Sequence, residues 1–157
     1  MQKTVYSNLH TFGEIAGDAY EQMRAIQDIQ QKPRSDGSEG LILTYDPSRQ
    51  SFKQAVIAIA FFGIWIESLL HILIVDRFDE KTFLKYDFKS YRAKLELLGF
   101  ADVPLLDSID KFQIARKHLM HEKAHLDSGR LMFAQIEAQR AHEIFRAIEA
   151  ELEKSHG

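Results

Sequence analysis

The sequence lacks cysteine altogether, and it has only three prolines and one tryptophan in 157 residues. Without cysteine, the chain has no disulfide, no thiolate metal site and no thiol nucleophile, which is compatible with a reducing compartment. Its length leaves room for one domain, residues 1–157, and its 45% hydrophobic content is ordinary for a globular protein.

An excess of positive charge is also missing. Lysine and arginine number 20 against 23 acidic residues, which gives a formal net charge of −3. This balance argues against a broad surface for duplex DNA, so any contact with nucleic acid has to be local. The sequence MQKTVYSNLHTFGE at the N-terminus has no apolar run of the signal-peptide kind, and we therefore expect a cytoplasmic protein.

One apolar run, residues 55–75, is long enough to cross a bilayer, which takes about 20 residues. Glu67 and His71 lie inside it, and an ionised group near mid-membrane costs about 2.5–3.5 kcal/mol even on lenient insertion scales. A single span would also leave the remaining chain without a central element. We expect a buried central helix and no membrane association.

No run alternates convincingly as a strand would, whereas helical periodicity recurs along the chain. Gly99 is a suitable left-handed cap, and Asp102 with Pro104 indicates a helix start. Residues 41–45 suit a short extended piece packed against the helices, and residues 79–88 are ambiguous. The sequence predicts an all-α, up-and-down bundle of four to five helices, drawn from residues 7–29, 48–75, 89–98, 102–125 and 130–154.

The segment of residues 116–121, RKHLMH, contains the residues of greatest interest. On a helical wheel, Arg116 falls near the middle of an apolar face formed by Leu105, Ile109, Phe112, Leu119 and Met120. A guanidinium there needs a partner, and Glu67 is the lone acid of the apolar second helix. Two interpretations follow: a core ion pair without chemistry, or an arginine oriented by Glu67 to stabilise a phosphate or a transition state.

Three histidines, His118, His121 and His125, share the opposite side of this helix with Ile114. Such a face is able to bind a metal, to transfer protons, or simply to be solvated near a helix C-terminus. The surrounding residues 111–130 are locally basic, which suits phosphate. Their cations are Lys111, Arg116, Lys117, Lys123 and Arg130, against the acids Glu122 and Asp127.

Residues 121–125, HEKAH, match the H-E-x-x-H pattern of zinc metalloproteases. Lys123 places a positive charge inside the motif, and no strand-rich half precedes it. Glu143 or Glu149 would have to serve as a distant third ligand. We interpret the match as a coincidence, with a metal enzyme as an open alternative.

Three features together resemble the HEPN superfamily of small helical-bundle domains. They are the long apolar helix with its internal acid, the K-x-x-x-L-G segment from Lys94 to Gly99, and the R-x4-H motif of Arg116 and His121. The resemblance covers nearly the whole chain in helix order. Lys117 stands where active members often carry Asn, Asp or His, and Lys123 stands where members paired with a nucleotidyltransferase antitoxin often carry tyrosine.

The resemblance implies metal-independent RNA cleavage at a site shared by two copies of the chain, as in many toxins and phage-defence proteins. His121 would assist attack by the 2′-hydroxyl or protonate the leaving oxygen, and Arg116 would stabilise charge on the phosphate. No metal or other cofactor is expected. The expected partners are RNA and a second copy, with an antitoxin or regulatory protein as a further candidate. The alternative is a non-catalytic module that binds RNA, a nucleotide or a protein. Glu67 and Lys117 are expected to orient the catalytic pair, and the expected RNA contacts are Lys111, His118, Lys123 and His125.

Overall fold

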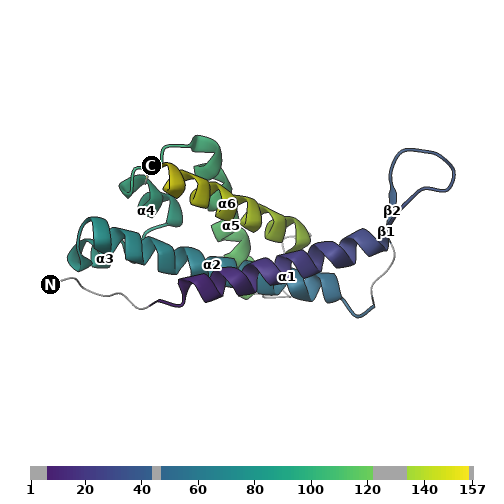
Figure 1. Ribbon diagram of the computed structural model, residues 1–157, viewed down its shortest axis with the longest axis horizontal. Coiled ribbons are helices and arrows are strands. Elements are labelled where there is room, and N and C mark those ends of the chain that lie inside the picture. Colours follow the sequence, from purple (N-terminus) through teal and green to yellow (C-terminus); the bar gives the residue numbers. More distant parts are fainter. Residues whose placement is uncertain (1–6, 44–46, 122–133, 156–157) are drawn as a thin grey trace.

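The computed structural model describes residues 7–43, 47–121 and 134–155. These ranges hold six helices and one short hairpin (Figure 1). The prediction of an all-α, bundle-like fold is confirmed, but four to five helices is too few, because the ambiguous segment 79–88 also forms a helix. The helices are α1 (Leu9–Gln30), α2 (Gln50–Arg77), α3 (Glu80–Tyr86), α4 (Tyr91–Leu97), α5 (Val103–Met120) and α6 (Ala134–Ser155).

The hairpin follows α1 directly. Strands β1 (Gln31–Pro33) and β2 (Leu41–Leu43) pair antiparallel, with Gln31 opposite Leu43. The extended piece expected at residues 41–45 is confirmed for residues 41–43. It pairs with β1 and projects from the end of α1, instead of lying against the bundle as expected (Figure 1).

Helix α2 is the central element of the fold. It runs beside α1 and also packs against α6, α5, α4 and α3 (Figure 1). By length and composition α2 would be able to cross a membrane, and half of its most apolar window is buried inside the bundle. The sequence predicts a central helix packed among the others, and α2 occupies this position. Its buried side chains include Ala55, Ala58, Ile59, Phe62, Trp65, Ile66, Leu69, Leu70 and Ile74.

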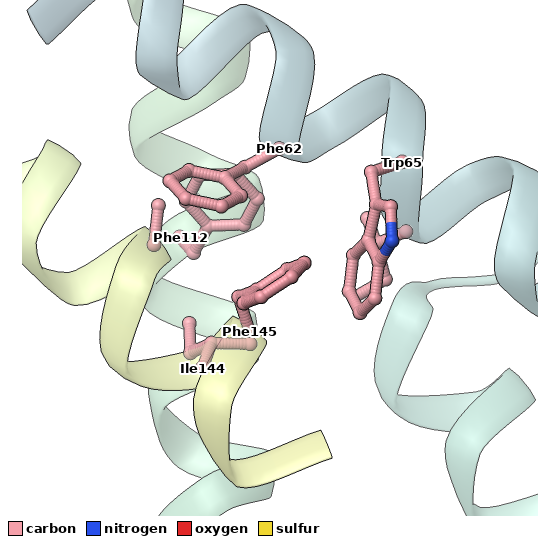
Figure 2. Close-up of a pocket in the computed structure, with 7 residues that line it drawn as sticks. Phe62, Trp65, Phe112, Ile144 and Phe145 are labelled. Atoms are coloured by element: carbon pink, nitrogen blue, oxygen red, sulfur yellow. The ribbon is translucent and has the colours of Figure 1, made fainter. Parts of the chain in front are cut away.

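An aromatic cluster joins α2 to α5 and α6, as Figure 2 shows. The ring of Phe145 lies 4.4 Å from that of Trp65 and 5.4 Å from that of Phe62, measured between centroids. The gap among these side chains leaves no room for a water molecule, so the cluster is packed core and not a ligand site. It fixes α2 against α5, because Phe112 of α5 belongs to the same cluster.

The three helices that follow α2 begin at side-chain caps. Asp79, Ser90 and Asp102 accept hydrogen bonds from the backbone N–H groups of Thr82, Ala93 and Leu105, at the starts of α3, α4 and α5. Gly99, with φ of +92°, ends α4 as expected. These boundaries hold the short α4 in the connection between α2 and α5.

Helix α5 differs from its prediction at the C-terminal end. It ends at Met120, with His121 as its capping residue, and residues 122–125 of the predicted helix lie outside the described ranges. Met120, expected on the buried face, is 41% exposed, whereas Leu105, Ile109 and Phe112 are buried as expected. Leu119 still packs against the core, so within the last turn of α5 it is Met120 that departs from the predicted face.

Candidate functional site

Arg116 and Glu67 form the ion pair that the sequence predicts. Arg116 Nη1 donates to Glu67 Oε1 over 2.8 Å, and it also donates to the hydroxyl of Tyr91 over 2.9 Å. The Tyr91 hydroxyl in turn donates to Glu67 Oε1 over 2.6 Å. Three helices, α2, α4 and α5, thus meet in one closed hydrogen-bond triangle.

This triangle lies at the wall of a groove and not in the centre of the core. The side chain of Arg116 is 22% exposed and that of Glu67 is 48% exposed. Arg116 and Glu67 are therefore only partly buried, which differs from the interpretation of a core ion pair. The exposed part of the Arg116 side chain borders the groove, while Glu67 and Tyr91 hold the orientation of its guanidinium.

Arg116 crosses α2 directly over Gly63. A Cβ atom built on Gly63 would overlap Nε, Cδ and Cζ of Arg116, so this position has no space for a larger residue unless Arg116 moves. The Arg116 Nε is itself buried and has no hydrogen-bond partner within the described part of the chain. The lack of a side chain at Gly63 therefore allows Arg116 to lie directly against the backbone of α2.

The effect of Gly63→Ala on the free energy of unfolding is expected to depend on which residue occupies position 116. In the wild type the added methyl displaces Arg116, and overpacking of this kind lowers the free energy of unfolding by about 1–3 kcal/mol. In Arg116→Ala the obstacle is gone, and alanine should raise the free energy of unfolding by about 0.5–1 kcal/mol through its better helix propensity. Urea unfolding of the four proteins measures this double-mutant cycle. An equal effect of Gly63→Ala in both backgrounds would show that Arg116 does not lie over Gly63.

Tyr91 is the member of the triangle that the sequence did not reveal. It begins α4, is 4% exposed, and its backbone N–H donates to Gln113 Oε1 of α5 over 3.0 Å. Burial raises its pKa well above the ordinary value of 10.0, and the hydrogen bond to Glu67 raises it further. The phenol is thus neutral at physiological pH and acts as a fixed donor to Glu67.

Arg92, the next residue, fastens α4 to α5. Its Nη1 lies 2.9 Å from Asp107 Oδ1 and 2.7 Å from Asp110 Oδ2. A guanidinium shared between two carboxylates of one neighbouring helix restrains both the distance and the rotation of α4. This restraint keeps the Tyr91 hydroxyl within reach of Arg116.

The groove beside the triangle has a volume of about 730 Å³. This is within the size range of ordinary ligand sites. It is bounded by α2, by α3 and the connection to α4, and by α5. Its lining residues are Glu67, Ser68, His71, Phe83, Asp87, Phe88, Lys89, Tyr91, Lys94, Gln113, Arg116, Lys117, Met120 and His121.

The structure brings four of the predicted site residues together in this groove: Glu67, Arg116, Lys117 and His121. Two predicted RNA contacts, Lys111 and His118, are exposed on α5 but do not line it. The other two, Lys123 and His125, lie outside the described residues. Arg116 and His121 thus share one surface, although a helical wheel places them on different sides, because His121 lies just after the end of α5.

The groove is basic within an acidic protein. Its lining contains four cationic residues and two acidic ones, in a chain whose formal net charge is −3. The Lys94 side chain is buried, and its Nζ donates to the backbone oxygen of Asp87 over 2.8 Å. Burial lowers the pKa of Lys94 from its ordinary value. The exposed cations in the groove are Lys89 and Lys117.

His121 is exposed at the C-terminus of α5, where its backbone N–H donates to the oxygen of Lys117 over 3.1 Å. No described residue holds its imidazole by a hydrogen bond or ion pair. An unheld, solvent-accessible imidazole is able to accept or donate a proton. It lines the same groove as Arg116.

No group of three or more His, Asp or Glu side chains able to hold a metal ion occurs in residues 7–43, 47–121 and 134–155. Of the H-E-x-x-H match, only His121 falls within these ranges, and residues 122–125 lie outside them. The groove residues within these ranges are suited to proton transfer and anion binding.

The groove residues that escaped the sequence interpretation include Tyr91, His71, Phe83 and Phe88. Phe88 is 97% exposed, which is unusual for so large an apolar side chain.

Comparison of the chain with models of protein families, with curated proteins and with solved structures gives no match.

Proposed function

We propose that this groove cleaves RNA without a metal ion, in the manner of HEPN ribonucleases. The observation that carries the proposal is that Arg116 and His121, the two motif residues, line one groove. Arg116 is held there by Glu67 and Tyr91, which is the preorganisation that electrostatic catalysis requires. Lys89 and Lys117 add the local positive charge that phosphate needs.

In the proposed reaction the ribose 2′-oxygen attacks the adjacent phosphorus while the bond from phosphorus to the 5′-oxygen breaks. A base removes the 2′-hydroxyl proton, and an acid protonates the departing 5′-oxygen. The products are a 2′,3′-cyclic phosphate and a 5′-hydroxyl, so neither water nor metal enters this step. His121 supplies one of the proton transfers, and Arg116 stabilises the negative charge that grows on the phosphoryl oxygens.

The groove opens to the surface, which suits a strand of RNA. Phe88 at its edge offers an exposed ring on which an unpaired base is able to stack, and such stacking is a common feature of single-strand binding. We further propose that two copies of the chain place their grooves together to form a composite site, and that the protein acts in the cytoplasm as a toxin or defence nuclease.

A non-catalytic module that binds RNA, a nucleotide or a protein partner is the second candidate. It is favoured by one observation: Arg116 Nη1 gives its hydrogen bonds to Glu67 and Tyr91, so part of the guanidinium already serves the fold. In that case the groove binds phosphate but does not cleave the strand.

The proposed reaction predicts resistance to metal removal. Purified protein in excess EDTA is expected to cleave single-stranded RNA at an unchanged rate and to leave 2′,3′-cyclic phosphate ends. The matched control is the same RNA with 2′-O-methyl groups, which lacks the nucleophile and should remain intact. Cleavage that stops on chelation, or that proceeds on the methylated strand, would rule out this chemistry. Binding of both strands without cleavage would favour the second candidate.

A further inference from the structure

His71 is the one histidine among the described groove residues that the proposed reaction leaves without a role. It lies on α2 four residues after Glu67, and residues at this spacing share one face of a helix. Both side chains line the groove, together with His121 from the end of α5. Two imidazoles from different helices therefore face the same volume.

The His71 ring has a defined orientation. It stacks on the ring of Phe83 from α3, with 3.9 Å between centroids and 18° between planes. Within residues 7–43, 47–121 and 134–155, neither of its ring nitrogens has a hydrogen-bond partner. The stack holds one face of the imidazole and leaves its nitrogen edge available to a ligand in the groove.

The chemistry requires two proton transfers. An imidazole that removes the 2′-hydroxyl proton must be neutral, whereas one that protonates the 5′-oxygen must be charged. One histidine is not able to be in both states at the same moment, so concerted cleavage uses two groups. Arg116 is fully protonated, and Tyr91 is a neutral phenol committed to Glu67. Among the groove residues described, His71 is the remaining imidazole.

We propose that His71 is the second proton-transfer residue of the groove and is a catalytic partner of His121. This inference rests on the proposed ribonuclease function. One imidazole takes the proton of the 2′-hydroxyl and the other gives its proton to the 5′-oxygen, which balances the cyclisation described above. Both groups then belong to a single copy of the chain, so each copy brings one acid–base pair to the composite site.

Several charged groups face His71 and enter its pH dependence. They come from its own helix, from the segment between α3 and α4, from α4, and from α5 and its C-terminal cap. Acids and bases are both present, so the position of the pH optimum has to be measured. The groups are Glu67, Asp87, Lys89, Lys94, Arg116, Lys117 and His121.

The test is the pH dependence of RNA cleavage in EDTA for wild type, His71→Ala and His71→Gln. The wild type is expected to show a bell-shaped profile of kcat. Each His71 variant should have a kcat about 100-fold lower at the optimum, with KM nearly unchanged. Its profile should also lose one of the two limbs of the bell, either the rise at low pH or the fall at high pH. His121→Ala should lose the opposite limb. His10→Ala, on the exposed face of α1 outside the groove, is the control and should retain both limbs.

Each other result contradicts the inference. If the His71 variants cleave at the wild-type rate with both limbs, His71 takes no part, while the proposed ribonuclease function stands. If they are slow but keep both limbs, the histidine has only a packing role against Phe83. Far-UV circular dichroism and urea unfolding identify a variant that has lost its fold, and His71→Gln preserves side-chain bulk. A wild type that does not cleave RNA overturns both proposals together.

Discussion

Arg116→Ala is expected to abolish RNA cleavage while leaving the protein folded. Removal of one fixed donor from a transition state typically lowers kcat by about 10²–10³-fold. The free energy of unfolding should fall by only about 1–2 kcal/mol, because Glu67 is 48% exposed and water solvates it once its partner is gone. A fully buried pair would lose about 3–5 kcal/mol on the same change. Cleavage rates and urea unfolding, measured on the same preparations, give the two quantities.

Arg116→Lys is the matched control for this prediction. Lysine retains the charge but lacks the planar fork that contacts Glu67 and Tyr91 together. We expect it to bind RNA nearly as well as the wild type and to cleave it much more slowly. If Arg116→Ala unfolds the protein at room temperature, the residue is structural, and the account of a preorganised catalytic arginine is wrong.

His121→Ala is expected to produce the second large loss. Proton transfer by a positioned side chain contributes about 10²–10⁴-fold to a rate, and the loss should appear in kcat with little change in KM. Stability should hardly change, because His121 is exposed and no described residue binds its imidazole. The measurement is steady-state cleavage of one short RNA.

His118→Ala serves as the control for His121→Ala. Both histidines are exposed near the end of α5, three residues apart, but only His121 lines the groove. Equal losses in the two variants would indicate a general effect on this end of α5. A loss confined to His118 would move the site to the opposite face of the helix.

Several parts of the structure could be predicted from local sequence. Asp102 with Pro104, and Gly99 after α4, are boundary signals that act through nearby backbone atoms, so the helix start and stop were found. The pairing of Arg116 with Glu67 was also predictable, because each was the unexpected charge in an apolar helical stretch.

The remainder of the site depends on tertiary placement. Tyr91 reaches Glu67 because α4 is fastened to α5 by Arg92, a contact 15 and 18 residues distant in sequence. Gly63 looks like any small residue in an apolar helix, and its role appears only where Arg116 crosses α2. His71 gave no signal either, because its groove includes residues of α3 and the connection that follows it.

The helical wheel also misplaced two side chains at the end of α5. It put Met120 on the buried face and His121 on the far side from Arg116. The wheel assumes a continuous helix, but α5 ends at Met120, and His121 adopts φ of −118° and ψ of 36°. That change in the backbone accounts for His121 lying in the groove that Arg116 and Met120 also line.

The most direct test of the central claim is RNA cleavage in excess EDTA by the wild type and by the double variant Arg116→Ala/His121→Ala, purified identically and shown to be folded by circular dichroism. If the groove is the ribonuclease site, the wild type releases 2′,3′-cyclic phosphate products and the double variant releases none above background. If the folded double variant cleaves RNA as fast as the wild type, or if neither protein cleaves it, the groove of Arg116 and His121 is not a ribonuclease site.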